Sequence, residues 1–531
     1  MNNTLDYIRM FLQFPIALRR LLKHTMTLDN ACRIVRERME HREENFLRIV
    51  KRSVYGYPCS PYLALLKMVG CEFEDLSALV KQRGLEGALC KLREEGFYVT
   101  FEEFKGRKPI IRFGKTIPVE ARDFDNPFAQ RDYTSQTSGS TGLATYVALN
   151  LDYFVDKLPH QMFILSAYGI MGVPTAYWLS ILPGNGLQAI LQRTDLREPL
   201  HHWFSYLGWR ESKCWLKYDV ATLYMVFWLH TLGACVPFPK IVNLNQPLVI
   251  ARWIHDTLKT HSRCVLNTLP SHALRVAVAA QESGFDLTGA TVRIAGEPVT
   301  PAKVAEMRRV GLRVVPIYAM TETCNIALGC VNPTAADDMH LFKDAFALIT
   351  YPYPVEGSGI TVPAFNLSTL LDSTSKLMLN VQIDDYGIVE ERTCGCELET
   401  YGYTTHLREI HSYSKLVGEG VTLIENEMLR ILEEILPARF GGSSLDYQLV
   451  EQEDKQGFTR LYLLIHPRIE IVDEQAVIEA VLKELRGSSP MADAARTVWQ
   501  QAHTLRIMRQ EPVVTAAGKL LPLHIQRYIK T

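Results

Sequence analysis

A segment rich in hydroxyl and glycine residues is the part of the sequence best suited to binding phosphate groups. It reads Thr137-Ser138-Gly139-Ser140-Thr141-Gly142. Glycine allows backbone N–H groups to approach a phosphate closely, and the hydroxyl groups add further donors. No Gly-Lys-Ser/Thr sequence follows, so the segment differs from the P-loop of nucleoside triphosphatases. Taken alone, it is equally compatible with a solvated turn.

Four further motifs follow this segment along the chain. They are Gly296-Glu297-Pro298, Tyr318-Ala319-Met320-Thr321-Glu322, Asp384-Asp385-Tyr386-Gly387 and Gly518-Lys519. The first two come directly after short apolar runs, 291–294 and 313–317, that we predict to be strands. As an ordered set, the five motifs resemble those of the adenylate-forming superfamily, which contains acyl-CoA synthetases, peptide-synthetase adenylation domains and luciferases.

Further details resemble one branch of that superfamily, which contains phenylacetate–CoA ligase, coenzyme F390 synthetase and capsule-biosynthesis ligases. The first motif continues as Leu143-Ala144-Thr145, where the branch often has Pro-Thr. The segment Thr268-Leu269-Pro270-Ser271-His272-Ala273-Leu274 resembles the Thr-Pro-Ser-Tyr-Ala-Leu segment of the branch. Residues 44–104 look like its helical N-terminal region, and the resemblance covers most of residues 44–525.

The resemblance implies an ATP-binding site with Mg²⁺ as the metal cofactor. The residues Thr137, Ser138, Gly139, Ser140, Thr141 and Gly142 are expected to hold the β- and γ-phosphates. Tyr318 is expected to stack on adenine, because an aromatic face offers a π contact. Gly296, Glu297 and Pro298 are expected to line the adenine pocket. Asp385 is expected to accept hydrogen bonds from the ribose hydroxyl groups.

The resemblance also implies three catalytic residues. Thr321 is expected to contact the α-phosphate, and Glu322 to bind Mg²⁺ as a hard oxygen ligand. Lys519 is expected to bridge the attacking carboxylate and the α-phosphate. A cation in that position lowers the barrier because two anions must approach each other.

Two positions depart from the pattern of the superfamily. Asp384 stands where a glycine is usual, and the usual hinge Gly-Arg-x-Asp-Asp is replaced by Leu407-Arg408-Glu409-Ile410-His411-Ser412-Tyr413-Ser414-Lys415, within a hinge expected at 405–415. Arg408 is the candidate for the arginine that contacts ribose, and the hinge contains no aspartate. The unusual hinge puts the standard transfer of the acyl group to a thiol in question, more than the formation of the acyl-adenylate. An amine, a hydroxyl group or a protein group therefore stays an alternative acceptor.

Cysteine and histidine residues near the later motifs suit a structural Zn²⁺ site. They are Cys330, His340, Cys394 and Cys396. Some relatives of phenylacetate–CoA ligase carry zinc on a cysteine, a histidine and a late cysteine pair, and four such ligands suit tetrahedral coordination. Buried inert thiols and a redox or acyl-accepting cysteine are the alternatives.

Length and composition indicate a multidomain globular protein. The length of 531 residues favours two or more domains. The formal net charge of −1 argues against nucleic-acid binding. Its 11 scattered cysteines are typical of reduced thiols, and we expect a cytoplasmic protein. The apolar stretch 10–18 is too short to span a membrane, so we predict a surface helix. A membrane-surface contact through Phe11, Phe14 and Arg19-Arg20 is the alternative.

The pattern of apolar residues predicts an α/β fold with two domains. Residues 1–110 are expected to form a helical N-terminal region, 111–407 a layered α/β adenylation core, and 408–531 a small, mobile α+β domain. In the last part we predict helices at 423–436 and 475–485, strands at 447–450 and 459–465, and a final strand at 505–509.

The function that these patterns imply is ATP-dependent activation of a carboxylic acid, with an aromatic or other small acid favoured. The acyl group would pass to coenzyme A or an acyl carrier protein. The alternatives are a ligase that forms an amide, an ester or an acyl-protein, and a catalytically degenerate relative that only binds nucleotide. A homodimer is among the expected assemblies.

Overall fold

The computed structural model describes most of the chain. The described residues are 2–136, 146–210, 215–354, 361–412, 416–418, 421–423, 430–454, 458–471, 473–485, 490–513 and 523–525. The predicted phosphate-binding loop (137–142) and Lys519 lie outside them. No helix in the described part of the chain is long and apolar enough to cross a bilayer.

Helices form most of the N-terminal 110 residues, as the sequence predicts. They are α1 (Asn2–Leu21), α2 (Leu28–Glu40), α3 (Arg42–Val50), α4 (Pro61–Met68), α5 (Phe73–Glu94) and α6 (Phe101–Phe104). The side chain of Thr27 accepts a hydrogen bond from Asn30 N at the start of α2, and Thr100 and Glu103 form a capping box at the start of α6. The predicted surface helix is part of α1, which buries Phe14 and Leu18 against the body.

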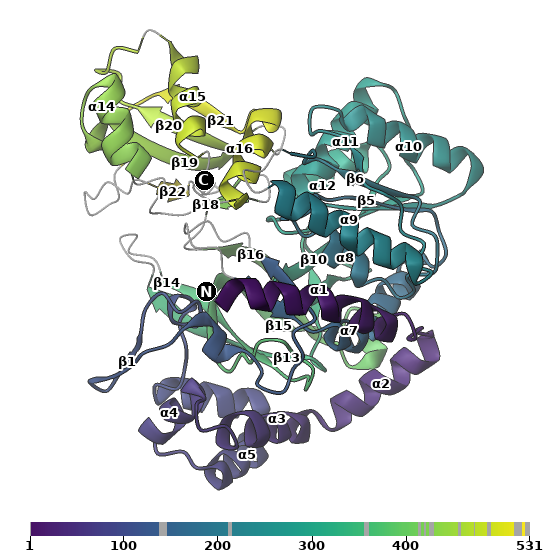
Figure 1. Cartoon of the computed structure of the whole chain (residues 1–531), viewed down its shortest axis with the longest axis vertical. Helices are drawn as coiled ribbons and strands as arrows, with labels where there is room; N and C mark the ends of the chain where they lie inside the picture. The colour runs from purple at the N-terminus through teal and green to yellow at the C-terminus, as the bar shows by residue number, and fades with distance from the viewer. Residues whose placement is uncertain are drawn as a thin grey trace.

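A sheet of twelve strands forms the centre of the molecule, in the order β13-β14-β15-β16-β12-β11-β10-β9-β8-β5-β6-β7. The strands from β10 to β7 run parallel: β5 (Thr175–Trp178), β6 (His202–Ser205), β7 (Lys240–Ile241), β8 (Cys264–Thr268), β9 (Ala290–Ala295) and β10 (Arg313–Met320). Helices α10 (Pro247–Thr260), α11 (Pro270–Glu282) and α12 (Pro301–Arg309) pack beside them (Figure 1). All five residues of β8 are buried, as expected for a parallel strand covered on both faces.

The other half of the sheet is antiparallel. It contains β11 (Cys324–Gly329), β12 (Met339–Leu341), β13 (Phe346–Pro354), β14 (Thr361–Thr369), β15 (Val381–Glu391) and β16 (Thr405–Ser412). The strand β16 is the last of the sheet in the chain and continues to Ser412. Residues 405–412 of the predicted hinge (405–415) therefore lie within a strand of the large sheet, and 413–415 lie outside the described residues.

A second, smaller sheet is built from the C-terminal residues, in the order β21-β20-β19-β22. Its strands are β19 (Tyr447–Glu453), β20 (Thr459–Ile465), β21 (Leu505–Arg509) and β22 (Leu523–Ile525), with helices α14 (Leu436–Phe440), α15 (Glu474–Glu484) and α16 (Pro490–Ala502). The mixed α/β fold that the sequence predicts, with a large and a small sheet, is confirmed.

Two predictions for this C-terminal part were wrong. The strand at 505–509 is not the last, because β22 follows it and pairs with β19 in parallel. The helix predicted at 423–436 was wrong at its start: Leu423 ends β18 (Val421–Leu423), which pairs with β17 (Leu416–Gly418). Its later part is helical, as a π-helical turn at Ile431–Ile435 followed by α14. The backbone of Leu423 is thus held by cross-strand pairing, which the local helical pattern could not reveal.

The two sheets are joined by specific polar contacts. Leu244 N donates to Gln501 Oε1 at 2.9 Å, and Lys303 Nζ donates to Thr459 Oγ1 at 3.1 Å. Gln501 lies on α16 and Thr459 on β20, so both contacts connect the C-terminal unit to the parallel half of the large sheet.

Candidate functional site

Two of the predicted motifs leave neighbouring parallel strands at the same edge of the large sheet. Strand β9 pairs with β10 in parallel, with Ala295 opposite Ile317. Gly296 therefore follows β9 beside Tyr318 on β10, and its φ of 90° suits glycine. The carboxyl ends of parallel strands are where α/β sheets commonly bind ligands.

The structure joins the predicted adenine and ribose residues directly. The Tyr318 hydroxyl donates a hydrogen bond to Asp385 Oδ2 at 2.7 Å, although 67 positions separate them in the chain. Burial, followed by the neighbouring Asp385 carboxylate, raises the pKa of Tyr318 well above its usual value, so the phenol stays a donor. Asp384 has a φ of 60°, in the left-handed region that Asp tolerates better than most residues. This backbone geometry explains how Asp384 can stand where the superfamily has glycine.

Thr321 and Glu322 lie in the short connection between β10 and β11. Met320 pairs with Cys324 at its base, and the Tyr153 hydroxyl donates to Thr323 O at 2.7 Å from α7 (Leu151–Ala167). The turn is thus anchored from below by a buried tyrosine.

Glu322 forms a buried ion pair with Lys105, a residue that sequence reasoning missed. The two side chains are 4% and 5% exposed, respectively. Burial alone would raise the pKa of Glu322, but the charge of Lys105 and its hydrogen bond lower it, so the carboxylate is ionised. Lys105 follows α6, and nothing in the sequence around it signals a partner more than 200 positions away. The predicted Mg²⁺ ligand therefore already has a cationic neighbour.

Glu297 ties the Gly-Glu-Pro motif to the start of α11. Its carboxylate accepts hydrogen bonds from Ser271 N at 3.0 Å and from Ser271 Oγ at 2.7 Å. The segment 268–274 and the motif at 296–298, which the sequence analysis singled out separately, thus meet at the edge of the sheet. The carboxylate at the N-terminus of α11 also complements the helix dipole.

Arg408, the candidate for ribose contact, is paired with carboxylates on the same sheet. Its guanidinium donates to Glu390 Oε2 at 2.9 Å and to Glu409 Oε1 at 3.1 Å. The ion pair with Glu390 raises the pKa of Arg408. Its contact with ribose stays a prediction.

The predicted zinc ligands come together from three separate segments, and His406 joins them from a fourth. Donor atoms of Cys330, His340, Cys394 and His406 all lie within 4.8 Å of one another. Cys396 Sγ is 3.2 Å from His340 Nε2, so the third predicted cysteine adjoins the group. His406 on β16 was missed, because only the pairing of β12 with β16 brings it opposite His340.

Neighbouring residues orient both histidines of this cluster. His340 Nδ1 donates to Tyr403 O at 2.6 Å, and His406 Nδ1 lies 2.7 Å from Asp338 Oδ1. These contacts turn each Nε2 towards the cysteines: His340 Nε2 lies 3.2 Å from Cys396 Sγ and 3.7 Å from Cys394 Sγ, and His406 Nε2 is buried without a hydrogen-bond partner. A backbone carbonyl or carboxylate behind the ring is the usual support for a metal-binding histidine.

Cys396 is the cysteine of this group best able to supply a thiolate ligand. A hydrogen bond from Cys330, followed by contacts with His340, lowers the pKa of Cys396 to about 3. The same hydrogen bond raises the pKa of Cys330, and burial raises the pKa of Cys394. Together, the two buried histidines and the neighbouring sulfur atoms fit Zn²⁺ in donor chemistry, and the five candidates exceed the four ligands of a structural site. The donors present therefore suit the predicted metal.

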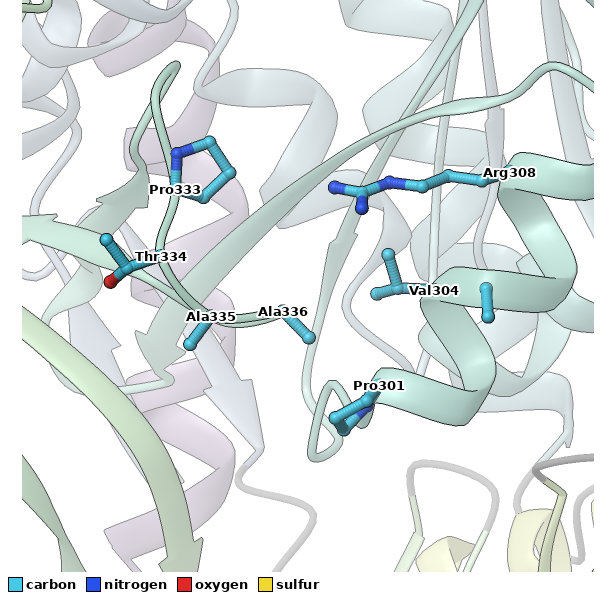
Figure 2. A pocket seen from close by; sticks show the side chains of 8 residues that line it. Pro301, Val304, Arg308, Pro333, Thr334, Ala335 and Ala336 are labelled. Atoms are coloured by element: carbon cyan, nitrogen blue, oxygen red, sulfur yellow. The ribbon is translucent and has the colours of Figure 1, made fainter.

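A cavity of about 340 Å³ lies between α12 and the loop 333–336, which follows Cys330 of the cysteine–histidine cluster. Figure 2 shows Arg308 reaching from α12 towards Pro333, with Val304 and Pro301 on the same helix. Its other lining residues are Ala305, Thr334, Ala335 and Ala336. Arg308 and the Thr334 hydroxyl group are the polar side chains among these eight residues.

Similarity to solved structures supports the fold. No protein-family model matches the chain, and no curated protein matches it. The structure of a 2-hydroxyisobutyryl-CoA ligase in complex with 2-HIB-AMP and CoA aligns with a TM-score of 0.55 and 14% identity, over 92% of this chain and 90% of that chain. A double mutant of o-succinylbenzoate CoA synthetase from Bacillus subtilis aligns with a TM-score of 0.39 and 14% identity, over 74% of this chain and 69% of that chain. The first alignment shows that the chain shares the fold of that ligase.

Proposed function

We propose that the chain is a ligase of the adenylate-forming superfamily, which activates a carboxylic acid with ATP and releases pyrophosphate. The observation that carries the proposal is the hydrogen bond between Tyr318 and Asp385, because it joins the two residues expected to bind adenine and ribose. A nucleoside bound there would lie beside the turn of Thr321 and Glu322, at the edge of the sheet where α/β folds bind ligands.

In the proposed reaction, a carboxylate oxygen of the acid attacks the α-phosphorus of ATP, and the bond to pyrophosphate breaks. Thr321 would contact the α-phosphate and Glu322 would hold Mg²⁺, which neutralises charge on the leaving group. The ion pair between Lys105 and Glu322 occupies one carboxylate oxygen of Glu322. Lys105 would therefore either share the Glu322 carboxylate with the metal or move away from Glu322. Lys519 and the loop 137–142 would supply the remaining cationic and hydrogen-bonding groups.

The test is ATP–pyrophosphate exchange across a panel of aromatic, fatty and amino acids. Replacing Lys519 with alanine is expected to reduce exchange on the order of 10²–10³-fold, as loss of one stabilising group typically does. The exposed Lys483, replaced by alanine, is the matched control and should leave exchange unchanged. ATP binding without exchange for any acid would instead favour a degenerate relative that binds nucleotide only.

For the second half-reaction, we propose transfer to the thiol of coenzyme A or an acyl carrier protein, with a small or aromatic acid as donor. The domain division 1–110, 111–407 and 408–531 belongs to this proposal, because the C-terminal unit would move between the half-reactions. Its contacts with the large sheet, such as Lys303 to Thr459, would then break and re-form.

A non-thiol acceptor is the second candidate. The observation that favours it is the hinge segment, which lies in β16 and lacks the usual aspartate. Product release stimulated by an amine and unaffected by coenzyme A would support this candidate over the thiol.

We also propose a structural zinc ion on the cysteine–histidine cluster. The support is the grouping of donor atoms within 4.8 Å and the free, buried Nε2 of His406. When bound, zinc would hold β12, β16 and the Cys394–Cys396 loop together. Metal analysis of protein purified without chelators should find about one Zn²⁺ per chain, and its absence would contradict the assignment.

A further inference from the structure

The helix α9 (Trp215–Thr231) has an exposed face that is almost entirely apolar. Leu216 is 62% exposed, Val220 51%, Leu223 46% and Phe227 58%. Their spacing of four, three and four residues places them along one face. Between positions 216 and 229, Lys217 is the only exposed residue that is polar. Exposed apolar patches of this kind usually mark an interaction site.

The apolar face continues onto α1, which lies beside α9. The Tyr224 hydroxyl donates to Phe11 O at 2.5 Å, and the two rings meet edge to face at 5.0 Å. Leu12 and Ile16, one turn apart on α1, are 70% and 62% exposed. Figure 1 shows the two helices side by side on the face turned towards the viewer.

Cations accompany this surface, and the described side chains of 11–24 and 216–231 include no exposed carboxylate. Arg19, Lys23 and Lys217 are exposed. Among the described side chains of 11–24 and 216–231, the one acidic residue is Asp219, which is 9% exposed and accepts a hydrogen bond from Arg210 N at 2.9 Å. The combination of protruding apolar groups with surrounding positive charge complements a surface that is apolar inside and anionic outside.

We propose that the α1–α9 face, defined by Leu12, Ile16, Leu216, Val220, Leu223 and Phe227, docks on an anionic lipid bilayer. The apolar side chains would enter the boundary between headgroups and acyl chains, and Arg19, Lys23 and Lys217 would contact anionic headgroups. A second copy of the chain fits less well. A two-fold interface places the same patch on both subunits and would bring these cations towards each other.

Flotation of the full-length chain with vesicles tests the proposal. Binding is expected to vesicles of equal parts phosphatidylglycerol and phosphatidylcholine, and to weaken with pure phosphatidylcholine or raised salt. The variant L223S/F227S should bind roughly tenfold more weakly, because two inserted apolar groups are lost. The variant R19E/K217E should lose roughly tenfold on anionic vesicles alone.

The matched control is I111S/L445S, which makes the same kind of change at residues 58% and 64% exposed outside the patch. It should bind vesicles as the unaltered chain does. Equal binding by L223S/F227S and the unaltered chain, or failure of the unaltered chain to float, would overturn the proposal. A dimer in solution that L223S/F227S dissociates, without vesicle binding, would assign the face to a second copy instead.

Discussion

Replacing Lys157 with methionine is expected to stabilise the protein at neutral pH. Lys157 lies on α7 and is 2% exposed, and its Nζ has no hydrogen-bond partner. The amine sits over the Phe346 ring, 4.4 Å from the centroid, and near Phe342 at 5.3 Å. Burial is the largest influence and lowers the pKa of Lys157 to about 7, from 10.5 in an unfolded chain. Folding near pH 8 therefore requires this lysine to lose its proton.

Proton linkage gives the sign and the size of this lysine's effect on the free energy of unfolding. Between pH 7 and 10.5 the unfolded chain binds one more proton at this site than the folded chain, so stability rises with pH across that window. Below pH 7 both states are protonated and the unfavourable contribution is complete. At about 1.4 kcal/mol per pH unit, the contribution is on the order of 4–5 kcal/mol. Methionine is similar in size and apolar, so the Lys157→Met variant should recover a substantial part of it at pH 7.

Urea unfolding of the variant and the unaltered chain between pH 6.5 and 9.5 measures this difference. The variant should be more stable at pH 7, and its advantage should shrink as pH rises. Lys483→Met, at an exposed position, is the control and should leave the pH dependence unchanged. A variant that is less stable at pH 7, or whose advantage is constant with pH, would refute the reasoning.

Three further predictions concern the candidate sites. Tyr318→Phe removes the donor to Asp385, and the loss of a hydrogen bond to a charged group, about 1.5–3 kcal/mol, should raise the KM for ATP in pyrophosphate exchange roughly 10–100-fold. An unchanged KM would show that the hydrogen bond from the Tyr318 hydroxyl group to Asp385 does not contribute to nucleotide binding. Lys105→Met leaves Glu322 buried without its cation and should lower the free energy of unfolding by about 3–5 kcal/mol. The double variant Lys105→Met/Glu322→Gln should recover part of that stability, because the unpaired charge is removed. An equal loss of stability in the single and the double variant would rule out charge as the cause. His406→Ala should lower zinc affinity roughly 10–100-fold or more in a chelator competition, and unchanged affinity would remove His406 from the ligand set.

Much of the fold could be predicted because its signals are local. The runs 291–294 and 313–317 form parts of β9 and β10, and the helix at 475–485 corresponds to α15 within one residue at each end. Alternation of strands and helices indicated the α/β layers, since each element carries its own apolar pattern. The strand at 421–423 was missed because it depends on its partner at 416–418.

The candidate site divides in the same way. The chemical types of Tyr318, Asp385 and the cysteine–histidine residues were evident from the sequence, because the chemistry belongs to the side chains themselves. Their partners were not: Lys105 pairs with Glu322 across 217 positions. His406 joins His340 only through the pairing of β12 with β16.

The sequence by itself therefore determined much of the order of elements, the class of fold and the chemical types of the residues proposed to bind nucleotide or metal. The tertiary structure alone decided which charges neutralise one another, which donor completes the metal-type cluster, and that the face of α9 remains exposed. The physical reason is that strand pairing and helix packing bring together residues hundreds of positions apart, and burial then sets their charge. No local pattern records such contacts, because each depends on the whole path of the chain.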